Sequence, residues 1–411
     1  MSMVVRGAPA AVVVVAGLSA LAAAETLSVP SPSFSTIQSA IDASENGDVI
    51  EVGPGTYVEL IDFLGKDIVV RGVEGAESTT IDGDGLGSVV TFVLGETSAA
   101  KLEGFTLING AGAPDGGGIL VVDASPTIDA CVVTACVANG SPANQGGGGI
   151  AVRNNSSPFI SRTVFYANTS SLGGGALAIL GATPTFFGCV FADNEAQFGG
   201  GCANEQGSPA SYINTTFVNN FAPVAPGICN FQSTSIVRNC IVWGHSPNIF
   251  NVGGGNTTAS YSLIGEAFPG EGNINADPLF VPDAKGAVPV FALSEGSPAI
   301  DAGNEALASA DLPDADGDGD TSELYPYDVK GAARVQGKTI DMGASEFVAG
   351  GPECNAADLA KPFGTLDIAD VVAFLRAFGA SEAPADLGAP FGSFDIADVV
   401  AFLRLFGDGC P

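Results

Sequence analysis

Short sequence markers recur along the middle of this chain at a nearly constant spacing. The tetrapeptides "CVAN", "FYAN", "FADN" and "FVNN" begin at residues 136, 165, 191 and 217, which is 29, 26 and 26 residues apart. A glycine run followed by an apolar or Cys residue, and a Ser/Thr-Pro pair, recur between them at the same period. The intervening apolar runs hold only three to five residues, as in "ILVV" and "ALAIL". A fixed period of this length with such short runs predicts a solenoid whose rungs are short, stacked parallel strands.

The Phe and Asn of each marker have a natural place in such a coil. Stacking of rungs would put Phe165, Phe191 and Phe217 above one another in the interior. The Asn that ends each marker would form a ladder of amide hydrogen bonds at a buried turn. We therefore expect these Asn residues to be structural, and we expect Cys136 to open the first marker of the series.

A solenoid needs caps at its open ends. Before the first expected rung at Val49–Val52, Ser35 and Gln38 have the spacing of a capping box, and an apolar face follows at Ile37, Ala40 and Ile41. These features predict a short helix that covers the core. At one rung per 26 residues, the body up to residue 346 would hold roughly 11–12 rungs.

Several segments resemble a known class of proteins. "TIQSAIDASENGDVIEVGPGTYVELIDF" resembles the start of right-handed parallel β-helix proteins of the pectin-lyase-like class. "GSPAIDAGN" and "GKTIDMGASEF" resemble the closing segment of exported bacterial β-helix proteins. The resemblance covers about residues 33–347. It implies a mainly β chain, a single-stranded right-handed parallel β-helix.

The C-terminal part is a duplication. Twelve of the thirteen residues Asp367–Gly379 recur at Asp395–Gly407, and each copy predicts an acidic loop followed by an apolar helix. This pair resembles a dockerin of the bacterial variant that ends in Gly-Cys, a small α-helical module that binds a cohesin receptor. We expect a Cys354–Cys410 disulfide to join the ends of the module, since both cysteines bracket it closely.

The dockerin resemblance implies calcium in the two loops. Its candidate ligands depart from the family pattern by one inserted residue, and Ala360, Pro362, Gly388 and Pro390 stand where the family has acids or Asn. The candidates are Asp358, Asp367, Asp370, Asp386, Asp395 and Asp398.

A second acidic segment could hold a cation. Asp314, Asp316, Asp318 and Asp320 alternate with small residues, as in the first half of an EF-hand loop. Tyr325 stands where the twelfth ligand would be. A calcium site and a merely solvated loop both fit this pattern.

Charge and targeting signals place the chain outside the cell. Its 45 acidic and 14 basic residues give a formal net charge of −31, which argues against nucleic-acid binding. Arg6, an apolar run and the small residues Ala22–Ala24 form a secretory signal, and nothing later is apolar enough to span a membrane. We expect a bacterial secreted or cell-surface protein. The predicted parts are a signal peptide (1–24), the β-helix (25–348), a linker (349–353) and the dockerin-like module (354–411).

Export permits disulfides, and six cysteines lie in the coil. We expect them to be small buried hydrophobic residues, with one or two bridges as the alternative. The six are Cys131, Cys136, Cys189, Cys202, Cys229 and Cys240.

The coil shows no recognisable catalytic motif. We expect Asp193 and Glu195 to be surface charges, and His245 to occupy a turn where Asn would serve equally. Lyases of the class resemble one another in a basic residue beside calcium-binding aspartates. The mid-coil candidates for that base are Arg153, Arg162 and Arg238.

We therefore name no catalytic residue. The predicted function is a non-catalytic binding or scaffold protein for polysaccharide, anchored to a cohesin-like or other cell-surface receptor through its tail. The alternatives are a polysaccharide lyase or glycoside hydrolase of the pectin-lyase-like fold, and a structural coat protein. A groove with two carboxylates, or with Arg beside Asp, would favour an enzyme.

Overall fold

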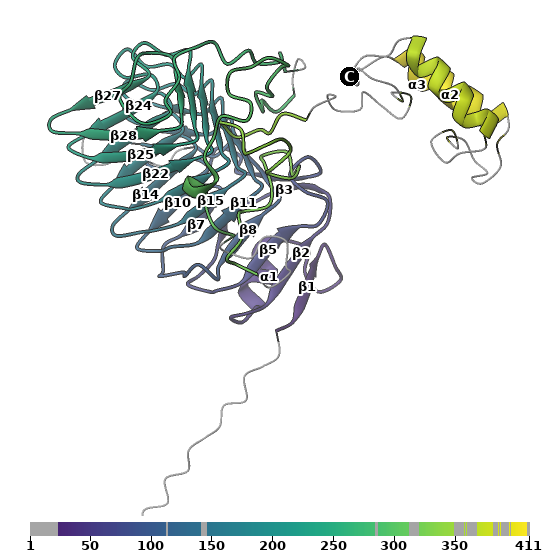
Figure 1. The fold of residues 1–411 in the computed structure, drawn as a ribbon. Helices are drawn as coiled ribbons and strands as arrows, with labels where there is room; N and C mark the ends of the chain where they lie inside the picture. Colours follow the sequence, from purple (N-terminus) through teal and green to yellow (C-terminus); the bar gives the residue numbers. More distant parts are fainter. Residues whose placement is uncertain are drawn as a thin grey trace, which may run out of the picture.

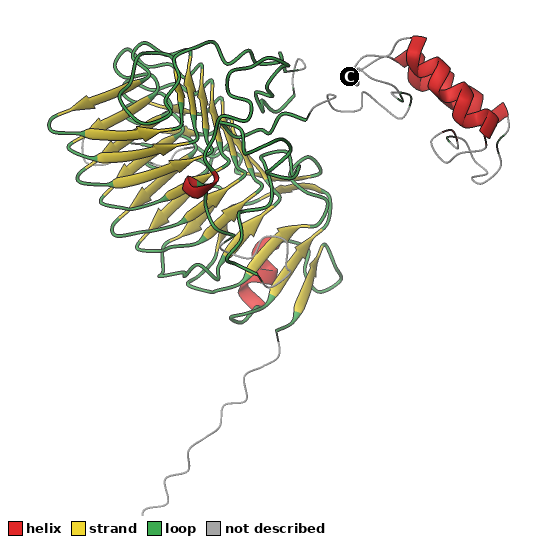
Figure 2. Ribbon diagram, viewed as in Figure 1, coloured by secondary structure: helices red, strands yellow, loops and turns green. Residues whose placement is uncertain are grey.

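The computed structural model describes residues 24–111, 114–140, 146–283, 287–311, 320–348, 368–380 and 396–408, together with residues 357, 359, 385, 387 and 394. The strands of the coil stack into three long parallel sheets, so the predicted mainly β solenoid is confirmed (Figures 1 and 2). The signal peptide and the linker lie outside the described residues, apart from Ala24.

The three sheets, here named A, B and C, receive strands in turn as the chain winds. Sheet A contains β1 (Thr26–Val29), β2 (Val49–Val52), β5 (Val69–Gly72), β8 (Lys101–Glu103), β11 (Thr127–Asp129), β15 (Phe159–Ser161), β19 (Thr185–Phe187), β22 (Pro209–Ile213), β25 (Thr234–Arg238) and β28 (Asn256–Ser260). Sheet B contains β3 (Gly55–Val58), β6 (Thr79–Asp82), β9 (Thr106–Ile108), β12 (Val132–Thr134), β16 (Val164–Tyr166), β20 (Val190–Ala192), β23 (Thr216–Val218), β26 (Ile241–Trp243) and β29 (Leu263–Ile264). Sheet C contains β4 (Ile61–Asp62), β7 (Val90–Phe92), β10 (Ile119–Val122), β14 (Ile150–Arg153), β18 (Leu177–Leu180), β21 (Cys202–Glu205), β24 (Ile228–Phe231) and β27 (Ile249–Val252). A short pair, β13 (Val137–Ala138) and β17 (Thr169–Ser170), lies between sheets B and C in the chain.

The predicted aromatic stack fills the interior. The Phe165 and Phe191 rings are stacked with centroids 5.0 Å apart, and those of Phe191 and Phe217 are 4.6 Å apart. All three side chains are fully buried, because parallel register places each ring over its counterpart in the next rung.

The predicted amide ladder also forms. The Asn194 Oδ1 accepts hydrogen bonds from the Asn168 backbone N and Nδ2, at 3.0 and 3.1 Å. The Asn220 Oδ1 accepts the same pair from Asn194, at 3.1 and 2.8 Å. Each side-chain Nδ2 also donates to a backbone carbonyl of the preceding rung. The ladder therefore satisfies a buried turn at three successive rungs.

The first marker is out of phase with this ladder. Val133 pairs with Phe165, and the Cys136 backbone N donates to the Asn168 Oδ1 at 3.1 Å. Cys136 thus ends the repeat rather than opening it, and Asn139 is not a ladder residue. The prediction was wrong because strand register follows the inward apolar residues of β12, while the longer connection to β14 absorbs the extra length.

The N-terminal cap is present with two corrections. Helix α1 (Ile37–Ala43) buries Ile37, Ala40 and Ile41 as predicted. Its capping box is Thr36 with Ser39, one residue later than predicted. The Glu59 carboxylate accepts the backbone N–H groups of the first two helical residues, which fixes that start. Strand β1 precedes β2, so Val49–Val52 is not the first strand of the coil.

The coil has about nine turns rather than roughly 11–12. Its last regular strand ends at Ile264, and the described residues 287–311 and 320–348, here called the strap, pack against the coil without adding rungs; they include the 3-10 helix η1 (Glu305–Leu307). The Gly343 N donates to the Asn239 carbonyl at 2.7 Å, and the Ala344 N donates to the Thr216 Oγ1 at 2.9 Å. The end of the strap is therefore hydrogen-bonded to residues in and next to sheet B.

The tail contains the two predicted helices, α2 (Ile368–Ala380) and α3 (Ile396–Asp408). The equivalent Phe374 and Phe402 stack across them with ring centroids 4.2 Å apart. Among the described residues, no helix is long and apolar enough to cross a membrane.

The amide ladder generates the first prediction. Asn194→Ala removes the partner of two buried donors on Asn168, and we expect it to lower the free energy of unfolding by about 3 kcal/mol. Gln197→Ala, which truncates an exposed amide in the same rung, is the matched control. Chemical denaturation of the full chain checks this, and equal loss in both variants would contradict the role of the ladder.

Candidate functional site

Sheet A carries the Arg-beside-Asp arrangement that would favour an enzyme. Arg162 donates to both carboxylate oxygens of Asp129, from Nε at 3.0 Å and from Nη2 at 2.5 Å. The Ser161 Oγ donates to the same carboxylate at 2.8 Å. Lys101 lies 3.8 Å away, and it also pairs with Glu103. These residues are neighbours because the parallel register sets β8, β11 and β15 side by side.

The strap covers this pair. The Tyr325 hydroxyl donates to the Asp129 Oδ1 at 3.2 Å, and its ring packs on Phe187 with centroids 4.8 Å apart. Tyr327 lies under the Arg162 guanidinium at 5.2 Å. Burial alone would raise the pKa of Asp129, but the hydrogen bonds and charge of Arg162 hold it below its usual range. A guanidinium neutralised in this way keeps its proton, so the geometry suits a structural ion pair rather than a general base.

The other two mid-coil arginines lie elsewhere. Arg153, at the end of β14, pairs with the buried Asp115 at 2.6 Å. Burial raises the pKa of Asp115, and the Arg153 charge partly offsets that rise. Arg238 ends β25, where its register neighbours are Ile213 and Ser260.

Asp193 and Glu195 are both exposed, on either side of the buried Asn194. Burial, with a smaller contribution from Asp283, raises the pKa of Asp193. The two acids are surface groups at a turn, as the sequence predicts.

His245 continues the amide ladder beyond Asn220. Its Nε2 accepts the Asn220 backbone N–H at 3.1 Å, and its Nδ1 lies 3.2 Å from the Asn248 Oδ1. An acceptor at Nε2 assigns the proton to Nδ1, so the ring is neutral. Burial lowers the pKa of His245 to about 4, and the Asn248 hydrogen bond offsets only part of that change.

The buried environment of His245 predicts that the folded protein loses stability at acid pH. The pKa is lower in the folded state, so the unfolded state binds the proton more readily. The stability that neutral His245 contributes is therefore complete above pH 6.5 and lost as the pH falls toward 4. We expect His245→Asn to keep the ladder and to flatten this decline by about 3 kcal/mol. Unfolding measured from pH 7 to 4 checks this, and parallel curves for variant and wild type would contradict it.

The six coil cysteines are buried and form no disulfide. Cys131, Cys189 and Cys240 alternate with Thr or Ser at one corner of successive rungs. The Cys240 Sγ accepts the Thr215 backbone N–H at 3.4 Å, and the Ser262 Oγ accepts that of Cys240 at 3.1 Å. Burial raises the pKa of the Cys131, Cys189 and Cys240 thiols to about 12, so they are unreactive packing groups.

Three of the candidate calcium ligands lie in described parts of the chain. Asp320 is exposed, and its carboxylate accepts hydrogen bonds from Ser322, which lower its pKa. Asp370 and Asp398 are fully buried and accept the backbone N–H groups of Leu359 and Leu387, each at 2.8 Å. This bond recurs in the two copies and joins Leu359 and Leu387 to the first turns of α2 and α3.

The remaining cation and disulfide candidates lie outside the described residues, so calcium and the bridge stay predictions of the sequence. Within the described parts of the chain, no three His, Cys, Asp or Glu side chains gather as metal ligands. The residues outside are Asp314, Asp316, Asp318, Asp358, Asp367, Asp386, Asp395, Cys354 and Cys410.

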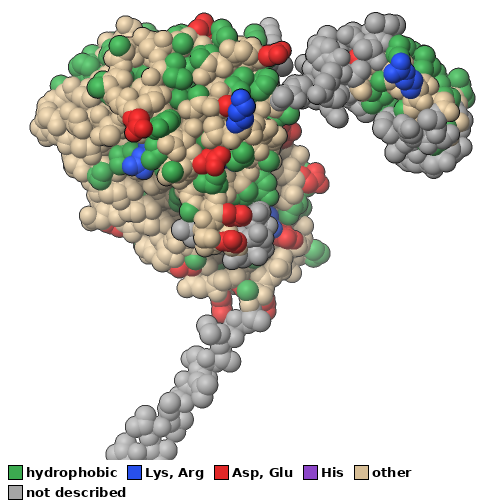
Figure 3. Space-filling model, viewed as in Figure 1, with side chains coloured by type: hydrophobic (Ala, Val, Ile, Leu, Met, Phe, Trp, Pro, Cys, Tyr) green, Lys and Arg blue, Asp and Glu red, His purple; other side chains and the backbone are tan. Residues whose placement is uncertain are grey.

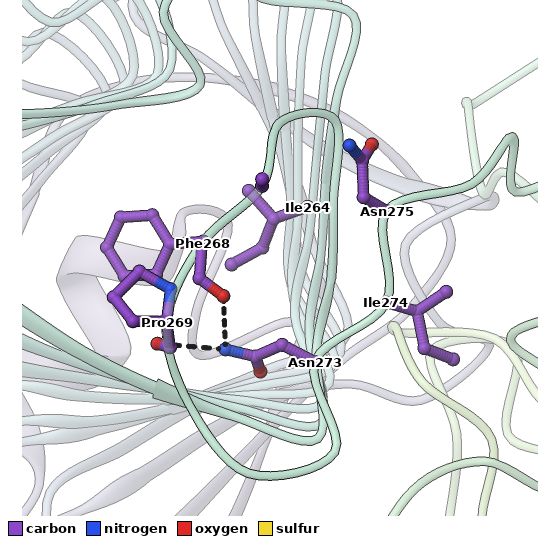
Figure 4. Close-up of a pocket in the computed structure, with 7 residues that line it drawn as sticks. Ile264, Phe268, Pro269, Asn273, Ile274 and Asn275 are labelled. Atoms are coloured by element: carbon purple, nitrogen blue, oxygen red, sulfur yellow. Dashed lines mark hydrogen bonds between the residues drawn. The ribbon is translucent and has the colours of Figure 1, made fainter.

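One cavity, of about 390 Å³, lies at the C-terminal end of the coil (Figure 4). Asn273 closes the loop around it by donating to the Phe268 and Pro269 carbonyls, at 3.4 and 3.2 Å. Phe268 packs against the coil interior. The lining residues carry no charge, and this loop is best explained as the cap of the open end.

A second cavity, of about 340 Å³, lies on the outer face of sheet C and is here called the aromatic cavity. It spans β21, β24 and β27, which follow one another near the C-terminal end of the sheet (Figure 1). It is lined by Phe198, Glu205, Val224, Cys229, Phe231, Phe250 and Val252.

Register explains the shape of the aromatic cavity. Its floor continues a column of small residues, in which Ala178, Ala203 and Cys229 pair in turn before Phe250 ends the column. One wall is formed by the neighbouring column of outward residues, in which Glu205 pairs with Phe231. The opposite wall comes from the bridge between Phe198 and Val224.

The aromatic cavity exposes apolar surface beside one acid. Phe198 and Phe231 are 37% and 42% exposed, which is high for phenyl rings. Glu205 is half-buried, and burial raises its pKa. In the described part of the chain, no side chain forms an ion pair or hydrogen bond with its carboxylate. Apolar rings beside a desolvated carboxylate make this cavity a candidate binding surface.

Sequence reasoning missed this site. Its signal is not periodic: aromatic residues enter the outward columns of sheet C in the last rungs, at Phe231 and Phe250. On the face shown in Figure 3, acidic side chains lie among uncharged ones, with a few basic side chains nearby.

A match to a protein-family model supports the fold. Residues 91–264 match the family described as "Right handed beta helix region", so the coil is a right-handed parallel β-helix. The structure is similar to a crystal structure of pectate lyase Pel9A, with 14% identity over 79% of this chain and 96% of that chain, at a TM-score of 0.40. It is also similar to a pectin methylesterase in complex with hexasaccharide VII, with 12% identity over 58% of this chain and 78% of that chain, at a TM-score of 0.31. No curated protein matches the sequence.

Proposed function

We propose that this chain is an exported, non-catalytic β-helix that binds polysaccharide on the outer face of sheet C and is anchored through its C-terminal helices. The aromatic cavity is the observation that carries the proposal. Phenyl rings with exposed faces are suited to the apolar faces of sugar rings, and a nearby acid supplies a polar contact.

The pairing of the acidic and basic side chains with one another supports binding over catalysis. Asp129 and Arg162 neutralise each other beneath Tyr325, and Asp115 is paired with Arg153. Neither pair presents an unpaired base beside a free acid, which proton abstraction or glycoside hydrolysis requires.

The tail supports the proposed anchoring. Val372 and Leu375 on α2 are 41% and 59% exposed, and the equivalent Val400 and Leu403 on α3 are 42% and 59% exposed. A duplicated apolar pair on the surface of a small module is suited to a protein receptor. A cohesin-like or other cell-surface receptor, extracellular location and calcium in the loops belong to this proposal.

A glycan-array screen of the full chain, with and without calcium, tests the proposal. We expect binding that Phe231→Ala lowers and that Phe221→Ala leaves unchanged, because Phe221 is exposed but does not line the aromatic cavity. Each glycan that binds is then incubated with the protein, and new reducing ends and unsaturated products are measured. Turnover would make the chain a lyase or glycosidase, and absence of any binding would favour a structural coat.

A further inference from the structure

We propose that the aromatic cavity recognises an amino sugar, with Glu205 pairing with the ammonium group while Phe198, Phe231 and Phe250 contact the sugar ring. This inference rests on the proposed polysaccharide binding and names the chemical class of the ligand. It is distinct from recognition of an acidic polysaccharide, which a chain with a net charge of −31 would repel.

The state of Glu205 is the first argument. Its carboxylate is half-buried between Phe231 in the next rung and Leu180 in the preceding one. The cation of the same column, Arg153, is two rungs away and is paired with Asp115. Burial raises the pKa of Glu205 because no described group compensates its charge. A ligand that brings a positive charge supplies this compensation, whereas a neutral hydroxyl group does not.

The three phenyl rings are the second argument. Phe198, Phe231 and Phe250 come from three different rungs and line the cavity together with Glu205. Aromatic faces attract organic cations and also pack on apolar C–H surface. A pyranose ring that carries an ammonium substituent offers both features in one residue.

The floor of the cavity is the third argument. Cys229 and Phe250 are register neighbours on the outer face of sheet C, and both line the cavity. The cavity beside the small Cys229 side chain, of about 340 Å³, gives a sugar ring room to lie against the strands. Because the residues that line the cavity come from successive rungs, an oligomer is the appropriate probe.

Titration calorimetry of the full chain with a β-1,4-linked glucosamine tetramer tests the proposal. The comparison ligands are the N-acetylated tetramer, which retains the rings and lacks the charge, and a β-1,4-linked glucose tetramer. We expect the amine to bind best, and we expect Glu205→Gln to weaken it at least about tenfold. Glu195→Gln, which neutralises an exposed acid outside the cavity, is the matched control and should bind like wild type.

The variants separate the possible outcomes. Equal affinity for the three tetramers, or an unchanged affinity in Glu205→Gln, would overturn the amino-sugar assignment. If Phe231→Ala still weakened the binding of those tetramers, the proposal that polysaccharide binds at this cavity would stand. No binding of any tetramer by the wild type would also overturn the assignment, and the glycan array would then decide the proposed function separately. Unfolding curves of each variant establish that it is folded.

Discussion

Parallel hydrogen bonding between rungs is the constraint on which the rest of this structure depends. Each strand of the coil lies beside its counterpart in the next rung, so residues about 26 apart in the sequence become neighbours in a column. A column must then be chemically compatible along its length. Three kinds of column meet that requirement: stacked Phe rings, an amide ladder, and alternating thiols and hydroxyls. Stacking buries the apolar rings and pairs the buried polar groups, which a single rung could not do alone.

The same constraint decides what the charged residues do. Columns on sheet A bring Lys101, Asp129 and Arg162 together, and the strap then seals them with Tyr325. Buried charges placed in this way are stable only when they neutralise one another, which removes them from acid–base chemistry. Sheet C differs, because aromatic residues enter its outward columns beside one acid, Glu205. The binding site that we propose therefore lies where the residue types in the columns of sheet C change.

The sequence predicts the interior better than the surface. Phe165, Phe191 and Phe217 repeat at a fixed spacing, so their stack and the adjoining ladder could be read directly. Cys136 could not, because it replaces Asn in the ladder and a longer rung, of 32 residues, separates it from Asn168. Arg162 and Asp129 are 33 residues apart and meet through register alone. The aromatic cavity depends on Phe198, which lies in a connection outside the strands, so no periodic signal marks it.

A crystal structure of the full chain with the glucosamine tetramer bound tests the central claim most directly, because it shows which surface of the coil holds the ligand. The account predicts sugar rings over Phe198 and Phe231, with an ammonium group at hydrogen-bond distance from the Glu205 carboxylate. A tetramer bound on sheet A beside Asp129 and Arg162, with the strap displaced, would contradict it and would restore an enzymatic reading of the coil.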